Sequence, residues 1–252
     1  MEYKPALLDL LYKMADDQLI LGHRNSEWTG IGPLLEEDIA FSSMAQDKLG
    51  HSLALYQLLH ELGEADPDSL AFMRNANQFH CCHLVELPIG DYEFSLMRHF
   101  LFDHAELLRF EALTQSAYEP LAKVAVKLKS ELKYHVLHAN TLIRQLGTAT
   151  PESIGRLQMA LTEAWPYALS IFEESKWEDQ LEAYNLFTGE AKLKENWLHQ
   201  IEAILSQTNL IIPDTNTVTP ALGGRIGLHT PFLQPLLDEM TEVYKIDPTA
   251  EW

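Results

Sequence analysis

Apolar residues recur at intervals of three and four along most of this chain. This is the period of an α-helix with one buried face, and it predicts helical segments. They cover residues 5–22, 33–63, 91–117, 119–146, 151–176, 190–208 and 231–245. No run of alternating apolar and polar residues indicates a sheet. The pattern therefore predicts an all-α protein.

Residues that end helices stand between these segments, and they support the same division of the chain. They include Gly63, Pro88, Pro120, Gly147 and Pro151. Residues 209–230 form the one long irregular stretch, which is typical of a functional or interfacial loop. Because no low-complexity linker divides the chain, we predict a single domain over residues 1–252. We expect a four-helix bundle at about 5–147, with further helices and the long loop at 148–252.

Four acids repeat across the first 147 residues, at positions that suggest a metal site. Asp16 lies 31 residues before Asp47, and Asp103 lies 28 residues before Glu131. In ferritin-like bundles, one acid comes from the first helix of each pair, and an acid with a histidine comes from the second. The apolar stripes of their helices predict that Asp47 and Asp103 point inward, and they leave Asp16 and Glu131 unassigned. The sequence therefore predicts a ferritin-like core.

The residues that follow two of these acids argue against bound metal. A di-iron site needs histidine at the third position after each acid, and Gly50 and Tyr134 stand there instead. Histidines do follow, but at the fourth position, as His51 and His135. They share a helix face with the acids and could approach a metal from another angle. We predict that no metal is bound and that the ligand positions are vestigial.

If no ion is present, the buried acids need other partners, because an unpaired buried carboxylate is costly. The candidates that carry a suitable charge or hydrogen bond are His51, His135, Lys48, Arg98 and Arg109. Such a network would fix the register of the helices and would perform no oxygen chemistry.

Composition narrows the partners and the compartment. The 18 basic and 37 acidic residues give a net charge of −19, which disfavours binding to nucleic acid and to anionic membranes. The lysines at 123, 127, 129 and 133 are most simply a solvated helix face. Cys81 and Cys82 are the only cysteines and are adjacent, so we expect no disulfide. With no signal peptide in the pattern, we predict a cytoplasmic protein.

Several longer stretches resemble the C subunit of the bacterial phenylacetyl-CoA epoxidase, a family of phenylacetate catabolism. They are "HRNSEWTG" (23–30), "AQDKLGH" (45–51), "DSLAFMRNANQF" (68–79), "LVELPIGDYEFSLMRHFLFD" (84–103), "ELKYHVLHANTLIRQLG" (131–147) and "GGRIGLHTPFLQPLLDEM" (223–240). The resemblance implies a ferritin-like fold and no working metal centre on this chain. It also implies that the di-iron centre and the thioester site belong to the catalytic A subunit, so no catalytic or cofactor-binding residue transfers to this chain.

Three hypotheses follow. The first is a non-catalytic subunit that pairs with the A subunit, contacts other subunits of the epoxidase complex, and forms a homodimer when isolated. The second is a metal-binding oxygenase with its own degenerate site, and the third is a metal-storage protein. An obligate interface should be apolar, and the candidates for it are the loop at 209–230 and five aromatic residues. These are Trp28, Trp165, Phe172, Trp177 and Trp197.

Overall fold

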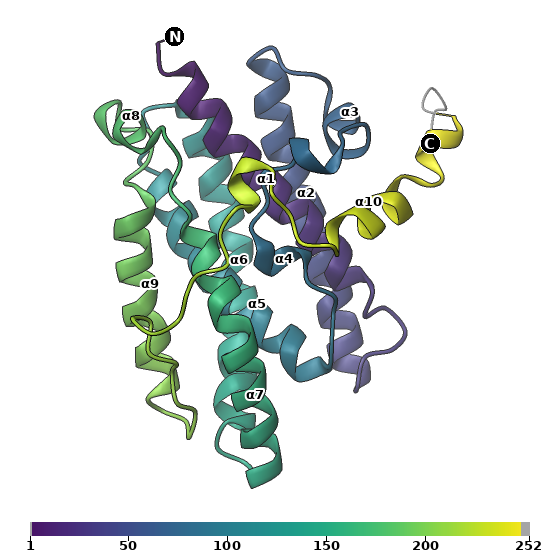
Figure 1. Cartoon of the computed structure of the whole chain (residues 1–252), viewed down its shortest axis with the longest axis vertical. Coiled ribbons are helices and arrows are strands. Elements are labelled where there is room, and N and C mark those ends of the chain that lie inside the picture. The colour runs from purple at the N-terminus through teal and green to yellow at the C-terminus, as the bar shows by residue number, and fades with distance from the viewer. Residues whose placement is uncertain (1, 248–252) are drawn as a thin grey trace.

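Four long helices form the core of the protein, as the sequence predicted. The structure is a computed structural model that describes residues 2–247, and it contains no strand within them. The long helices are α1 (Lys4–Ser26), α2 (Leu35–Glu61), α5 (Tyr92–Leu113) and α6 (Glu119–Leu146). Helix α1 packs along α2, α5 packs along α6, and α2 also contacts α6 (Figure 1). The prediction of an all-α, ferritin-like bundle is confirmed.

The helix ends lie close to the predicted breakers, for identifiable reasons. Gly63 has φ +95°, a left-handed conformation that favours glycine, and it stands just after Leu62, the residue that caps the end of α2. Thr150 caps α7 (Pro151–Ala168) by accepting a hydrogen bond from the Ser153 amide, and Pro151 stands in the first turn. Helix α6 likewise carries a proline in its first turn. Local chemistry therefore sets these boundaries.

Several short elements were not predicted, because each is shorter than the window over which a helical period is visible. They are α3 (Pro67–Phe72), α4 (His83–Glu86) and α8 (Glu178–Ala183), with 3-10 turns at Ala76–Gln78 and Gly224–Ile226. Two further 3-10 turns, at Leu169–Phe172 and Tyr244–Ile246, fall at the ends of the segments predicted as 151–176 and 231–245, where the α-helices themselves end earlier, at Ala168 and Thr241. Helices α3 and α4 lie in the long connection between α2 and α5, and α4 also contacts α1. This connection joins the two helix pairs of the bundle.

Helices α7 and α9 (Glu190–Leu205) pack against α5 and extend the core. The rings of Trp165 and Trp197 stack at 5.3 Å between centroids, and Phe172 lies 5.0 Å from Trp197. All three are buried, as is Trp28, while Trp177 is half-buried. As interface candidates, the four buried aromatic residues were therefore wrong. Their helical spacing reflects packing within the chain.

The irregular stretch at 209–230 crosses the outside of the bundle and returns to α1 before α10 (Leu233–Thr241) begins (Figure 1). The Ala221 amide donates to the Pro166 carbonyl at 3.0 Å, and the Gly223 amide donates to Glu173 Oε2 at 2.8 Å. Arg225 is buried, and its guanidinium lies 2.8 Å from Asp17 Oδ2 on α1. The stretch is therefore fixed to the core by an ion pair. No helix within residues 2–247 is long and apolar enough to cross a membrane.

Candidate functional site

The centre of the bundle holds a fully buried carboxylate. Asp103 of α5 has no exposed surface, and Lys48 Nζ of α2 lies 2.5 Å from its Oδ1. His99 Nδ1, one turn earlier on α5, lies 2.7 Å from Oδ2, and His135 Nδ1 of α6 lies 3.3 Å from the same oxygen. Nitrogen-bearing side chains from three helices therefore surround one aspartate. Of the partners proposed for the acids, Lys48 and His135 are found here.

Two histidines connect this centre to acids at the surface in a reciprocal arrangement. His51 Nε2 on α2 lies 2.7 Å from Glu131 Oε2 on α6. Conversely, His135 Nε2 on α6 lies 3.0 Å from Asp47 Oδ2 on α2. The two imidazole rings stack with centroids 6.3 Å apart. The two helix pairs thus contribute equivalent histidine and acid pairs, as the internal repeat suggested.

The two outer acids lie at the rim of the site. The side chain of Asp47 is 40% exposed and that of Glu131 is 34% exposed. The prediction that Asp47 points inward was therefore wrong, whereas the same prediction for Asp103 is confirmed. Asp47 stands one position before the buried Lys48, and one residue turns a helix by about 100°. Its carboxylate consequently reaches His135 from the solvent side.

The positions predicted to have lost their histidines also face outward. Gly50 is exposed, and Tyr134 is 75% exposed. On each helix, a different pair of residues three positions apart faces inward. The pair is Lys48 and His51 on α2, and it is Leu132 and His135 on α6. The buried frame is thus shifted by one residue from the one that the sequence suggested. Both histidines are in place, and lysine and leucine stand where a metal site would need carboxylates.

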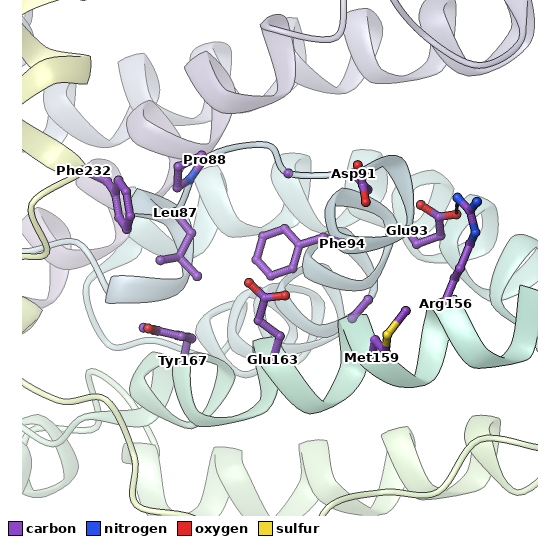
Figure 2. Close-up of a pocket in the computed structure, with 12 residues that line it drawn as sticks. Leu87, Pro88, Asp91, Glu93, Phe94, Arg156, Met159, Glu163, Tyr167 and Phe232 are labelled. Atoms are coloured by element: carbon purple, nitrogen blue, oxygen red, sulfur yellow. Dashed lines mark hydrogen bonds and ion pairs between the residues drawn. The ribbon is translucent and has the colours of Figure 1, made fainter.

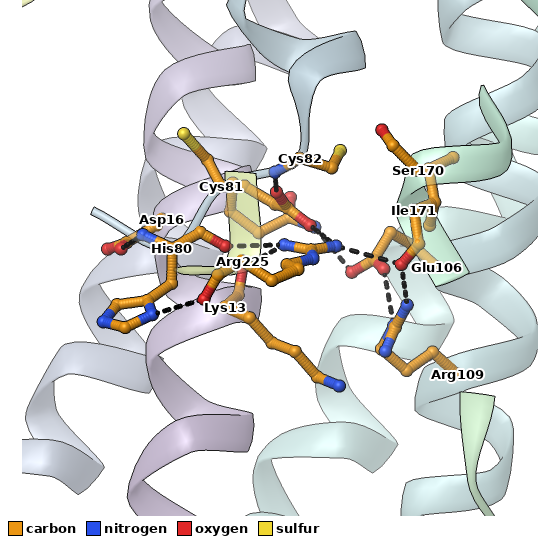
Figure 3. Close-up of polar contacts among 12 residues, drawn as sticks. Lys13, Asp16, His80, Cys81, Cys82, Glu106, Arg109, Ser170, Ile171 and Arg225 are labelled. Carbon is orange, nitrogen blue, oxygen red and sulfur yellow. Dashed lines mark hydrogen bonds and ion pairs between the residues drawn. The ribbon is translucent and has the colours of Figure 1, made fainter. Parts of the chain in front are cut away.

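Asp16 belongs to a different cluster. Its carboxylate is fully buried and accepts hydrogen bonds from Tyr56 Oη at 2.6 Å and from the His80 amide at 2.7 Å. Arg74 Nη2 completes the cluster at 2.5 Å from Asp16 Oδ1. Figure 3 shows Asp16 beside His80. Asp16 therefore anchors the segment that follows α3, and it does not join Asp103.

A second set of polar residues extends the site toward α2 and was not predicted. His138 Nδ1 on α6 lies 3.3 Å from His99 Nε2, and His138 Nε2 lies 3.1 Å from Glu37 Oε2. Tyr92 Oη donates to the same carboxylate oxygen at 2.6 Å. A chain of polar contacts thus runs from Glu37 through two histidines to Asp103. The available signal was the spacing of His99, four residues before Asp103 on one helix face.

The two arginines proposed as partners of the acids lie elsewhere. Arg98 donates to the Leu87 carbonyl at 2.6 Å, and burial lowers its pKa to about 9. Arg109 pairs with Glu106, at 2.9 Å (Figure 3), and it also pairs with Glu190 of α9. The contact with Glu190 fixes α9 to α5, whereas the contact with Glu106 lies within α5. They are part of the packing of the extended core and do not touch Asp103.

The electrostatic field of the site favours an anionic Asp103 and neutral side chains of His51 and His99. Burial alone would raise the pKa of Asp103, but Lys48 and His99 hold it well below its usual range. Burial, followed by the Lys48 ammonium, lowers the pKa of His51 to about 3. Burial also lowers the pKa of His99 to about 4, although Asp103 opposes this shift. For His135, burial lowers the pKa, but the contacts with the carboxylates of Asp103 and Asp47 outweigh it and raise the pKa.

These residues do not fit a pair of iron ions. Such a pair is held by carboxylates from all four helices together with two histidines. Here the fully buried carboxylate among the ligand positions on α2, α5 and α6 is that of Asp103, and Lys48 Nζ already contacts it at 2.5 Å. A divalent ion on Asp103 would lie within a few ångströms of this ammonium, and the two positive charges would repel each other. The ammonium of Lys48 therefore already provides the positive charge beside Asp103 that a metal ion would otherwise provide.

The histidine pKa values predict that the protein loses stability in mild acid. The unfolded chain binds a proton at each histidine near pH 6.5, whereas folded His51 and His99 do so near 3 and 4. Stability should therefore fall as the pH drops below about 6.5, by up to about 2.7 kcal/mol per pH unit from these two protons. His135 acts in the opposite direction: its contribution is present at low pH and is lost as the pH rises through its raised folded pKa.

Urea unfolding between pH 7 and pH 5 measures this slope. His51→Gln should reduce it by about 1.4 kcal/mol per pH unit, the contribution of one proton. His60→Gln serves as the control, because His60 is exposed at the end of α2. An equal slope in wild type and His51→Gln would contradict the lowered pKa of His51 in the folded protein.

The surface also carries an open groove of about 690 Å³ between the start of α5 and α7. Figure 2 shows Phe94 and Met159 beside the carboxylates of Asp91, Glu93 and Glu163. Arg156 Nη1 lies 3.1 Å from Glu93 Oε1 at one end of this groove. Its lining is thus apolar with an acidic rim, and it shares no residue with the Asp103 site.

The chain is similar in sequence to known proteins. A profile of the family described as "Phenylacetic acid catabolic protein" matches residues 1–252. The chain belongs to this family. The resemblance inferred from the motifs is therefore confirmed.

Two curated proteins of Escherichia coli (strain K12) are similar to this chain. The chain is 29% identical over 241 residues to the C subunit of 1,2-phenylacetyl-CoA epoxidase, and the match covers 95% of this chain and 96% of that protein. It is 23% identical over 170 residues to the A subunit of the same epoxidase, and this match covers 68% of this chain and 55% of that protein. The similarity thus extends along nearly the full length of the C subunit.

Proposed function

We propose that this chain is a non-catalytic subunit of a 1,2-phenylacetyl-CoA epoxidase complex, which stabilises the di-iron A subunit by pairing with it. The observation that carries the proposal is the contact of the Lys48 ammonium with Asp103, at the place in the bundle where a catalytic homologue would hold metal. The near full-length similarity to a C subunit supports the assignment to this complex. In this proposal, iron, thioester and oxygen chemistry belong to the partner.

A catalytic role for this chain has less support. His51 and His135 are present and buried, as the alternative of a degenerate metal-binding oxygenase requires. However, burial and Lys48 lower the pKa of His51, so its surroundings disfavour positive charge. With Lys48 and Leu132 at the two buried positions where carboxylates would stand, the pocket has too few anionic ligands for two divalent ions.

Exposed apolar side chains on α2 and α6 support the pairing. Leu53 is 56% exposed on α2, and Val126, Tyr134 and Leu137 are more than half exposed on α6. Because α2 contacts α6, these side chains lie on neighbouring helices that flank the Asp47 and Glu131 rim. Apolar residues gathered on adjoining helices are typical of a surface that a partner covers.

Co-expression with an A subunit of this family tests the proposal. The two chains should co-purify, and Leu137→Asp should reduce the recovered complex at least tenfold, because a buried unpaired charge costs several kcal/mol. Met159→Asp is the matched control, since Met159 is 66% exposed on α7, in the groove of Figure 2. Sedimentation of the chain alone measures whether it forms a homodimer. A chain that stays separate from the A subunit at micromolar concentrations would overturn the pairing.

A further inference from the structure

Three atoms of the types that bind metal ions meet beneath the irregular stretch, away from the Asp103 site. Cys81 Sγ, Glu86 Oε1 and His229 Nδ1 all lie within 4.8 Å of one another. Glu86 Oε1 is 2.7 Å from His229 Nδ1 and 3.7 Å from Cys81 Sγ, and Sγ is 4.0 Å from Nδ1. Cys81 and Glu86 are fully buried, and the His229 side chain is 6% exposed. Within residues 2–247, no other group of three histidine, cysteine or acidic side chains brings its ligand atoms this close together.

The atoms around this triangle already orient it. Thr230 donates from its amide and from Oγ1 to Glu86 Oε2, each at 2.7 Å, which leaves Oε1 free to face His229. His229 Nε2 lies 3.0 Å from the Phe79 carbonyl. Because a carbonyl only accepts, Nε2 carries a hydrogen. In the neutral ring the Nδ1 lone pair then faces the carboxylate oxygen, and a proton or a metal cation must lie between them. A ligating histidine typically has this same outer hydrogen bond.

We propose that Cys81, Glu86 and His229 bind a zinc-like divalent ion that joins the segment at 79–86 to the stretch at 223–230. One thiolate, one imidazole and one carboxylate form a ligand set that zinc accepts. Bond lengths of about 2.0 Å to nitrogen and oxygen and about 2.3 Å to sulfur fit within the observed triangle without movement of the backbone. Water would supply the fourth ligand. Binding releases the thiol proton of Cys81, and the proton of His229 Nδ1 where one is held, to solvent.

The neighbouring residues have other roles, which limits the site to these three side chains. His80 Nδ1 lies 2.9 Å from the Arg225 carbonyl, and His83 Nε2 lies 2.7 Å from the Leu228 carbonyl. The Cys82 amide donates to Asp17 Oδ1 at 2.7 Å, toward α1. Gly224 packs against the Cys81 carbonyl oxygen with no room for a Cβ, so the two segments approach closely here. An ion would reinforce contacts that already hold the stretch in place.

Cys82 provides a matched control, because it is as buried as its neighbour but is not part of the triangle. The purified full chain is freed of metal with a chelator and titrated with Co²⁺ and then with Zn²⁺. We expect one ion per chain, a sulfur-to-cobalt charge-transfer band, and an unfolding temperature raised by Zn²⁺. Cys81→Ser should abolish the band and weaken Zn²⁺ binding by about tenfold or more, whereas Cys82→Ser should retain both.

Two outcomes would overturn the proposal. Wild type that is folded by circular dichroism but shows neither the band nor Zn²⁺ stabilisation would mean that a proton joins His229 to Glu86. Equal Zn²⁺ binding by Cys81→Ser and wild type would mean that the ion is held by other surface groups. Neither outcome bears on the proposed function, because this site shares no residue with the Asp103 cluster.

Discussion

Replacement of Lys48 by methionine is expected to lower the free energy of unfolding by about 3–5 kcal/mol. Methionine keeps most of the volume of the lysine side chain but removes the ammonium that contacts Asp103 Oδ1. The fully buried carboxylate would then keep only its two histidine neighbours or take up a proton. Urea unfolding followed by circular dichroism at pH 7 measures the loss. Lys123→Met is the control, because Lys123 and its partner Glu119 are both largely exposed.

A second substitution distinguishes the loss of the ion pair from a simple packing defect. If the cost of Lys48→Met comes from the unpaired charge, Asp103→Asn in the same chain should recover a large part of it. A packing defect would instead make the two losses add. A Lys48→Met protein as stable as wild type would show that the ammonium does not stabilise the Asp103 carboxylate.

Replacement of Arg225 by methionine is expected to cost a similar amount, about 3–5 kcal/mol. Its guanidinium pairs with Asp17 at 2.8 Å and donates to the Ile171 carbonyl at 3.0 Å and to the His80 carbonyl at 2.9 Å. The substitution leaves the Asp17 carboxylate and three carbonyls without this partner, since the guanidinium also donates to the Lys13 carbonyl at 3.3 Å. Arg156→Met should change stability by less than about 0.5 kcal/mol, because Arg156 is half exposed.

The loss of Arg225 should also have a local signature. Arg225 joins the stretch at 209–230 to α1, so its removal should free that stretch before the bundle unfolds. Limited proteolysis should therefore cut within 209–230 faster in Arg225→Met than in wild type, at a urea concentration where both remain helical. If Arg225→Met is cleaved within 209–230 at the wild-type rate and has the wild-type midpoint of urea unfolding, the structural role of this arginine would be contradicted.

The helical period of the sequence was enough to predict the bundle, because a buried stripe at intervals of three and four residues has few alternative explanations. The segment at 119–146, for example, is the helix Glu119–Leu146 in the structure. Helices such as α4, with four residues, are too short to show a period and depend on tertiary contacts. The aromatic residues could not be divided between core and surface, since Trp165 and Trp197 follow the same spacing that a docking face would use.

The sequence predicted several residues of the site correctly, but it did not predict which positions of α2 and α6 face the interior. Asp103, His51 and His135 were identified, and they do face the interior. The error lay in choosing Asp47 as the inward residue of α2, because a buried lysine is rare and an acid before a histidine resembles a metal motif. The pairing of Lys48 with Asp103 offsets the cost of burying the lysine. That pairing joins residues far apart in the sequence, and no local pattern reveals it.

The corrected frame strengthens the proposal of a subunit without its own metal centre. A chain that had lost histidines but kept four buried carboxylates would still attract divalent ions. In this chain the buried positions three residues before His51 and His135 hold Lys48 and Leu132. The first provides an internal cation and the second provides no ligand at all. The Asp103 cluster therefore maintains the register of α2, α5 and α6 with a charge that the chain itself supplies.

Iron binding by the isolated chain tests the central claim most directly. The Cys81→Ser variant is used so that the separate thiolate site does not contribute. It is incubated with ferrous salt under anaerobic conditions, freed of unbound ion, and assayed for iron and for uptake of dioxygen. The account predicts far less than one iron per chain and no dioxygen uptake. About two tightly held irons per chain, with dioxygen consumed, would contradict it.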